Sequence, residues 1–246
     1  INPRLRPGEV RKVMTGIPGK TGLVYTLDRE TGEFLWATPT VAQNVITHID
    51  GATGTVTENP EVIFSALGQE VLVCPSWAGG KDWEAGAYSP LTHTMYFPLR
   101  NACQRLLSTT DGSGPYALAA RHELAPGTDQ LGTVRAISVE TGETAWLYEQ
   151  RAATTSLVAT GGGLLFGGDV NGRFRAFDQD TGEVLWKVNL GSPVTGYPIT
   201  FAVDEQQYVA VSTGTAANAG INLRMTPELR PSAGNNLFVF ALPGTN

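Results

Sequence analysis

The stretch Arg173–Trp186, RFRAFDQDTGEVLW, decides the fold. Its first half alternates up to Asp178, a polar turn containing Gly182 follows, and a second run ends at Trp186. This order of strand, glycine-containing turn and strand predicts a β-hairpin. The glycine supplies the positive φ that such a turn needs, and the threonine before it can hydrogen-bond the nearby backbone.

The same hairpin occurs three times. The other copies are Leu23–Trp36, LVYTLDRETGEFLW, and Val134–Trp146, VRAISVETGETAW. A Thr-Gly pair stands at the same distance before each tryptophan, and the pairs are Gly32 and Trp36, Gly142 and Trp146, and Gly182 and Trp186. An isolated hairpin cannot cover a tryptophan, so each copy must dock on a neighbour, which favours a β-propeller. The alternative is three unrelated hairpins in a β-sandwich, but the constant spacing favours the repeat.

The repeat divides the chain into segments of one partial propeller. We expect blade hairpins at 10–37, 86–149, 156–188 and 197–242, with irregular insertions at 38–85 and 100–132. The first and last segments each lack one strand, which leaves about three and a half blades where propellers close with about four to eight. The open ends predict a partner: the missing N-terminal half of a larger ring or a second copy of the chain.

Composition excludes several classes of function. The net charge of −6 over 246 residues predicts no binding to nucleic acid or anionic lipid. No apolar run is long enough for a membrane span, and the scattered histidines predict no metal cluster. The chain starts without a signal peptide or a methionine, so we expect its start to be a cleavage point or an artificial boundary. Cys74 and Cys103 form no CxxC motif and could be a disulfide or two buried thiols.

Four further segments carry a resemblance to a known family. They are Gly19–Arg29 (GKTGLVYTLDR), Thr47–Asp50 with Thr53–Gly54, Gly79–Trp83 (GGKDW) with Ala87–Pro90, and Leu164–Trp186. With the hairpins, they resemble the C-terminal part of the pyrroloquinoline quinone (PQQ) dependent alcohol dehydrogenases, including methanol dehydrogenase, and their tryptophan-docking motifs. The resemblance implies an all-β, eight-bladed propeller of four-stranded antiparallel blades with PQQ and calcium on its axis. This chain would be roughly half of that ring.

The resemblance implies roles for individual residues. Lys20 falls where the family's basic residue hydrogen-bonds the ortho-quinone oxygens, and a cation there stabilises negative charge. Asp82 falls where the family usually has an asparagine that contacts PQQ, and Lys81 or Lys20 could offset its charge. Trp83 matches an aromatic residue that lines the cofactor site. Without the resemblance, Lys20 would be a solvated lysine in a turn, and Trp83 could equally be packing within a blade.

Other implications concern the surroundings of the site. The resemblance favours a Cys74–Cys103 disulfide that ties down the segment bearing Asp82 and Trp83. Such a bridge favours an oxidising compartment, the periplasm. Gly214–Gly220 corresponds loosely to the last loop over the cofactor. Trp36, Trp146 and Trp186 would be the docking tryptophans.

The functional expectation is therefore a C-terminal portion of a PQQ-dependent alcohol dehydrogenase. The complete enzyme would oxidise a primary alcohol by hydride transfer to the quinone and pass electrons to a periplasmic acceptor such as a cytochrome c. Residues 1–19 contain no aspartate, so the catalytic aspartate and the calcium ligands are expected outside this chain. We therefore expect no catalytic residue here and no alcohol oxidation by this chain alone. The alternatives are a non-enzymatic scaffold of the outer-membrane assembly lipoprotein type, or a degenerate quinoprotein that has lost PQQ.

Overall fold

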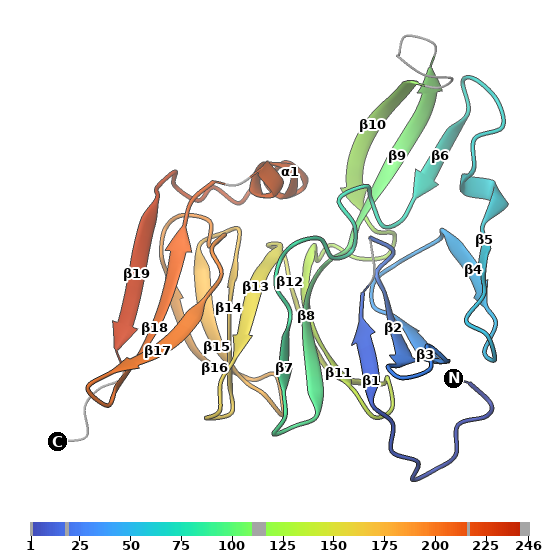
Figure 1. Cartoon of the computed structure of the whole chain (residues 1–246). Coiled ribbons are helices and arrows are strands. Elements are labelled where there is room, and N and C mark those ends of the chain that lie inside the picture. Colours follow the sequence, from blue (N-terminus) through green and yellow to red (C-terminus); the bar gives the residue numbers. More distant parts are fainter. Residues whose placement is uncertain (1, 18–19, 110–116, 216, 242–246) are drawn as a thin grey trace. The chain divides into compact units, whose positions relative to one another are not determined.

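The computed structural model describes residues 2–17, 20–109, 117–215 and 217–241. The chain folds into two compact units. Unit 1 comprises Ile1–Asp82 and Asn101–Asp129, and unit 2 comprises Trp83–Arg100 and Gln130–Asn246. Nearly all the regular structure in both units is antiparallel β-sheet, as the sequence predicted (Figure 1).

Unit 1 holds three antiparallel sheets (Figure 1). Their strand orders are β1-β2-β3, β4-β5 and β10-β9-β6. The elements are β1 (Val13–Gly16), β2 (Leu23–Asp28), β3 (Phe34–Pro39), β4 (Ile46–Ile49), β5 (Val56–Glu58), the short 3-10 helix η1 (Pro60–Val62), β6 (Glu70–Val73), β9 (Ala102–Thr109) and β10 (Ala117–Leu124).

Unit 2 also holds three antiparallel sheets, and Figure 1 shows them side by side with the helix α1 above the strands in this view. Their strand orders are β12-β11-β8-β7, β13-β14-β15-β16 and β17-β18-β19. The elements are β7 (Ala87–Ser89), β8 (Thr94–Arg100), β11 (Gly132–Ser138), β12 (Thr144–Gln150), β13 (Thr154–Ala159), β14 (Leu164–Asp169), β15 (Arg173–Asp178), β16 (Val184–Asn189), β17 (Ile199–Val203), β18 (Gln206–Thr213), α1 (Ala217–Met225) and β19 (Asn236–Ala241).

The core of unit 2 consists of apolar layers between neighbouring sheets. The first layer joins the β7–β12 sheet to the β13–β16 sheet and includes Tyr96, Val134, Trp146, Leu165 and Phe177. The second joins the β13–β16 sheet to the last sheet and includes Phe166, Phe174, Val194, Val209 and Val211. Each sheet thus buries its apolar face against the next, as expected for stacked blades.

Trp146 shows how one hairpin is fastened to the next. Its indole Nε1 donates a hydrogen bond to the carbonyl oxygen of Gln179 at 2.9 Å. Its ring lies against Gly182, where a Cβ atom would come within 2.6 Å of the ring. Gly182 also has a φ of +73°, so both the turn and the tryptophan require a glycine there.

The repeated turn has one hydrogen-bonding scheme. The Oδ1 atom of Asp178 accepts the backbone N–H of Thr181 at 2.9 Å, and the backbone N–H of Gly182 donates to the carbonyl of Asp178 at 3.0 Å. Asp28 closes the first hairpin in the same way. Asp50 does so in the β4–β5 hairpin, which is a further copy of the turn without the tryptophan. The scheme satisfies backbone donors that the turn would otherwise leave open.

Several predicted strands are confirmed. The segment 156–188 forms the four strands β13–β16, and all three Thr-Gly turns join hairpin strands. Within the described residues the first and last sheets have three strands each. Leu242, predicted to end the last strand, lies outside the described residues. That all six sheets form one partial propeller domain stays a prediction.

The two segments expected to be irregular contain strands. β4, β5 and β6 lie within 38–85, and β9 and β10 lie within 100–132. In the sheet of β6, β9 and β10, charged side chains help to connect the strands, so the sequence of these strands shows no clear apolar alternation. Arg105 on β9 contacts Glu70 on β6 at 3.2 Å and Glu123 on β10 at 2.8 Å. Such a cross-strand ladder stabilises a sheet without the pattern by which strands are recognised.

The helix α1 was not predicted either; in this part of the chain, only a loop at Gly214–Gly220 was named from the sequence. Its sequence, ANAGINLRM, contains a central glycine and two asparagines, which have low helix propensity. Tertiary contacts decide its conformation, since Ala219 and Asn222 are buried.

Candidate functional site

Lys20 lies in the turn between β1 and β2 of unit 1. Its Nζ atom is 3.4 Å from the Oδ2 atom of Asp82, and it stands 5.3 Å from the centre of the Trp77 ring. The side chain of Lys20 is 45% exposed, whereas that of Asp82 is 15% exposed. The structure therefore brings two of the residues named from the sequence together. Gly19, named with them, lies outside the described residues.

The glycine pair Gly79–Gly80 permits this approach. Gly79 has a φ of +75°, and a Cβ atom there would lie 2.8 Å from the Cβ atom of Lys20. A Cβ atom on Gly80 would lie 2.5 Å from Val41 and 3.3 Å from the backbone of Gly22. Both positions thus need glycine for the segment to reach the Lys20 turn. This is a local reason for the Gly-Gly-Lys-Asp sequence.

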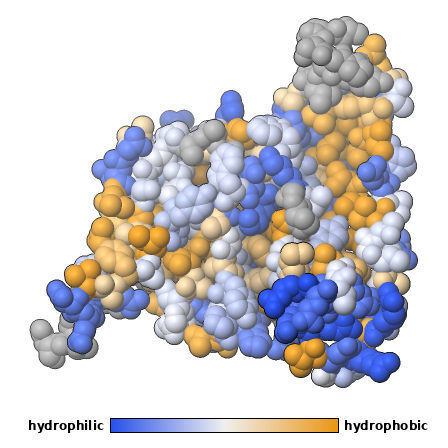
Figure 2. Space-filling model, in the orientation of Figure 1, coloured by the Kyte–Doolittle hydropathy of each residue, from blue (hydrophilic) through white to orange (hydrophobic). Residues whose placement is uncertain are grey.

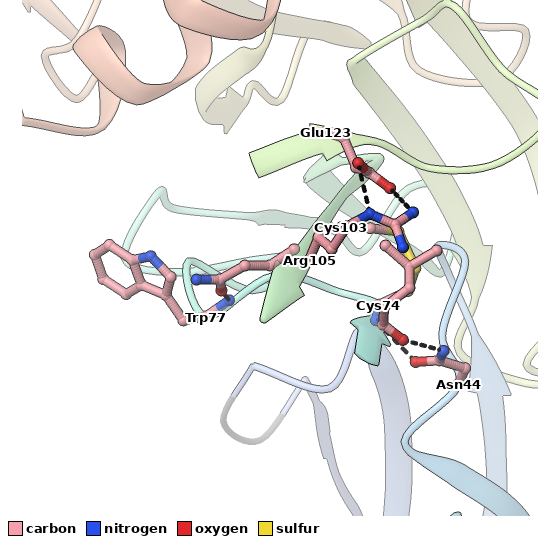
Figure 3. The surroundings of a disulfide bond; sticks show 8 residues. Asn44, Cys74, Trp77, Cys103, Arg105 and Glu123 are labelled. Atoms are coloured by element: carbon pink, nitrogen blue, oxygen red, sulfur yellow. Dashed lines mark hydrogen bonds and ion pairs between the residues drawn. A yellow bond between two sulfur atoms is a disulfide. The ribbon is translucent and has the colours of Figure 1, made fainter. Parts of the chain in front are cut away.

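The disulfide holds the start of the same segment. Cys74 and Cys103 form the predicted bridge, which is buried and joins the end of β6 to β9 (Figure 3). The Asn44 side chain accepts the backbone N–H of Cys74 at 2.8 Å, as Figure 3 also shows. The backbone N–H of Trp77 donates to the side-chain Oε1 atom of Gln104 at 3.0 Å. The bridge and these bonds fix the chain on the way to Asp82.

The electrostatics around Asp82 combine one carboxylate with two ammonium groups. Lys20 pairs with the carboxylate, and the Nζ atom of Lys81 donates to the backbone carbonyl of Asp82 at 3.1 Å. The face of an aromatic ring, here that of Trp77, favours a cation above it. Lys20 can therefore be held in place while its remaining N–H groups face a ligand. Such a group donates to carbonyl oxygens and stabilises negative charge on them.

Trp83 begins unit 2 and is 56% exposed. Its backbone carbonyl accepts a hydrogen bond from the hydroxyl of Tyr197 at 3.4 Å. Beside it lies a cavity of about 20 Å³, lined also by Glu84, Thr155 and Asn222, which is the size of a single water molecule. Glu84 pairs with the buried Arg100 at 3.2 Å. The cavity is too small for a cofactor within this unit.

Sequence reasoning missed some of these residues. Trp77, Glu84 and Arg100 were not singled out from the sequence. Little in the sequence indicated these residues, because Trp77 and Glu84 lie outside the strands. Their partners, Lys20 and Arg100, come from distant positions in the chain. No group of three or more potential metal-binding side chains exists among the described residues. In that same part of the chain, no helix is long and apolar enough to cross a membrane.

The three predicted docking tryptophans differ in environment. Trp36 is buried in β3 and Trp146 is buried against the next sheet, but Trp186 is 39% exposed. Trp186 meets Phe174 and Phe240 edge-on, at ring-centre distances of 6.1 and 5.2 Å. The role of Trp36 as a docking residue stays a prediction.

Comparison with known proteins gives consistent matches. A family model described as the PQQ β-propeller domain of glucose, ethanol and alcohol dehydrogenases matches residues 128–209. The chain is 34% identical over 226 residues to the lanthanide-dependent methanol dehydrogenase of Methylacidiphilum fumariolicum, covering 87% of this chain and 37% of that protein. It is 33% identical over 223 residues to the dehydrogenase subunit of the quinone alcohol dehydrogenase of Acetobacter aceti. This match covers 84% of this chain and 30% of that protein.

Solved structures agree. The structure of a europium-containing methanol dehydrogenase superposes with a TM-score of 0.81 at 28% identity, covering 95% of this chain and 48% of that one. The fold is thus the all-β propeller fold of these dehydrogenases. More particularly, the chain is related to the PQQ-dependent alcohol and methanol dehydrogenases, as the sequence resemblance predicted. It spans 37% and 30% of the length of the two curated relatives named above.

Proposed function

We propose that this chain is the C-terminal portion of a PQQ-dependent alcohol dehydrogenase and supplies one wall of its quinone site. The observation that carries the proposal is the position of Lys20, whose ammonium contacts the carboxylate of Asp82 and stands over the face of Trp77. The donor set fits an anionic ortho-quinone, because Lys20 and Lys81 both lie at Asp82 and offset its charge. The glycine pair beside Lys20 keeps other side chains out of this turn.

Each residue would have a defined role. When bound, PQQ supplies the carbonyl that accepts a hydride from the alcohol. Lys20 would donate hydrogen bonds to the quinone oxygens and stabilise the negative charge that develops there. Asp82 would hold Lys20, and Trp83 would contribute an aromatic wall. The general base and the ligands of the metal, calcium or a lanthanide, are assigned to the part of the enzyme outside this chain.

The proposal also names the structural partner. The last sheet leaves apolar side chains uncovered, and Figure 2 shows apolar atoms on the surface over β17–β19. These residues are 39–71% exposed: Ile199, Phe201, Val203, Leu237 and Val239. A sheet with an uncovered apolar face needs a neighbour. We assign that place to the N-terminal half of the propeller, and a second copy of the chain is the other occupant.

The remaining partners follow from the same family assignment. The substrate would be a small alcohol, and the electron acceptor a periplasmic protein such as a cytochrome c. The Cys74–Cys103 bridge supports an oxidising compartment, and hence the periplasm.

One alternative has a specific observation in its favour. The carboxylate of Asp82 lies at the candidate quinone site, where it would repel an anionic cofactor. A degenerate quinoprotein that keeps the fold without PQQ would tolerate this charge. The outer-membrane assembly scaffold stays a hypothesis that no residue of the site favours.

Titration of the chain with PQQ in the presence of calcium, followed by tryptophan fluorescence, tests the proposal. We expect saturable quenching in the native chain. Lys20→Gln should weaken binding about 10- to 100-fold, the value of a lost charge-assisted hydrogen bond. Lys12→Gln is the matched control, because Lys12 pairs with the exposed Glu30 and should leave binding unchanged. A flat response in the native chain would overturn the proposal that this wall binds the quinone, and it would favour the degenerate quinoprotein.

A further inference from the structure

Lys20 differs from an isolated lysine, because its ammonium already has a carboxylate beside it. The Nζ atom lies 3.4 Å from the carboxylate of Asp82, which is longer than an optimal charge-assisted hydrogen bond. The Asp82 carboxylate is largely shielded, whereas the Lys20 side chain is half-exposed. A ligand can therefore reach the ammonium without displacing Asp82, and it must then tolerate the negative charge behind it.

We propose that Asp82 makes Lys20 selective for uncharged carbonyl oxygens over carboxylates. The inference rests on the proposed quinone site and names the part of the ligand that this site accepts. PQQ carries both kinds of oxygen, carboxylates and quinone carbonyls. The Lys20–Asp82 pair would thus orient the cofactor with its quinone edge, and not a carboxylate, toward Lys20.

The selectivity has an electrostatic cause. An ammonium has three N–H donors, so Lys20 can contact Asp82 and still donate to a carbonyl oxygen. A carboxylate in the same place would lie within a few ångströms of the Asp82 carboxylate and be repelled. At the screening typical of a partly exposed site, that repulsion corresponds to about a tenfold loss of affinity. A neutral carbonyl carries no net charge and avoids it.

The ring of Trp77 restricts the direction of approach. The ammonium stands over its face at 5.3 Å and also lies beside the Asp82 carboxylate, so ring and carboxylate both take up space around the cation. Lys81 contacts the backbone carbonyl of Asp82 at 3.1 Å and adds positive charge nearby. The discrimination therefore depends on Asp82 itself, and removing only that charge should abolish it.

The test compares Asp82→Asn, which keeps the side-chain shape, with the native chain. The probe is trimellitate, an aromatic tricarboxylate without a quinone, and the readout is the NMR shift of the Trp77 indole N–H. We expect Asp82→Asn to bind trimellitate about tenfold more tightly. Glu30→Gln is the matched control, because it removes one negative charge from the exposed Lys12–Glu30 pair of the same unit. Unchanged trimellitate affinity in Asp82→Asn would overturn the inference.

Two further arms separate this inference from the proposed function. In the double variant Lys20→Gln with Asp82→Asn, the gain in trimellitate affinity should disappear; a retained gain would overturn the role of Lys20. PQQ is titrated in parallel. The substitution Asp82→Asn should raise the affinity for PQQ less than the affinity for trimellitate, because the quinone edge of PQQ already avoids the repulsion. An equal gain for both ligands would overturn the selectivity. If PQQ binds neither the native chain nor any variant, the proposed quinone function is contradicted. If Asp82→Asn still gains affinity for trimellitate in that case, the selectivity that we assign to Asp82 is supported.

Discussion

Trp146 and Trp186 occupy the same position in two copies of one hairpin, yet the structure predicts unequal contributions to stability. A tryptophan side chain buries about 200 Å², worth about 5 kcal/mol at about 25 cal/mol per Å². Trp146 is 9% exposed and Trp186 is 39% exposed, which reduces the value to about 4.5 and about 3 kcal/mol. Trp146 also donates a hydrogen bond to the carbonyl of Gln179, which contributes about 1 kcal/mol and is lost when the tryptophan is replaced by alanine.

We therefore expect Trp146→Ala to lower the free energy of unfolding by about 5.5 kcal/mol and Trp186→Ala by about 3 kcal/mol. Urea unfolding followed by far-ultraviolet circular dichroism measures both without depending on tryptophan emission. The phenylalanine variants refine the comparison: Trp146→Phe keeps the ring contact with Gly182 but leaves the Gln179 carbonyl without its donor. If Trp186→Ala lowered the free energy of unfolding as much as Trp146→Ala, the contact between Trp146 and the Gln179–Gly182 turn of the next sheet would not be what stabilises this hairpin.

Two further predictions concern unit 1. Replacing Cys74 and Cys103 by alanine opens a loop with a sequence separation of 29 residues and should lower the free energy of unfolding by about 3.6 kcal/mol relative to the oxidised native chain, measured by urea unfolding. Equal stabilities of the oxidised native chain and the double-alanine chain would contradict it. Hydrogen bonds from the Thr31 backbone and from Arg11 lower the pKa of Asp28 to about 2, from 3.8. The stability that Asp28 contributes is therefore complete above about pH 4 and lost as the pH falls through 2, so Asp28→Asn should flatten the melting temperature between pH 4 and pH 2. A melting temperature that falls as steeply in Asp28→Asn as in the native chain would refute this.

The sequence predicted the parts of the fold that repeat. The Thr-Gly turns were recognisable because a positive φ at Gly182 and its counterparts leaves a fixed signature. The turn at Asp50 has the same hydrogen bonds but no tryptophan after it, so it was not counted as a copy. β9 and β10 were missed because Arg105 joins its neighbours through charge, which leaves no apolar alternation. The helix α1 was missed because its propensity is low and burial decides it.

The candidate site was only partly predictable, for a different reason. Lys20 and Asp82 were named through a resemblance, and nothing in their spacing requires an ion pair. Their contact depends on the close approach that Gly79 permits and on the disulfide that fixes the chain before Trp77. Those constraints act over long sequence separations, which a local pattern cannot express.

The Lys20 site is therefore a product of the whole of unit 1. Its ammonium comes from the β1–β2 turn, while the ring and carboxylate come from a segment anchored at one end by the Cys74–Cys103 bridge. A lysine in an exposed turn loses side-chain entropy when it is held, so a single weak contact would not order it. Asp82 and Trp77 together supply two contacts to the cation, both on that one anchored segment. Loosening the segment, by reduction of the bridge, should then weaken binding at Lys20 even though no residue of the site has changed.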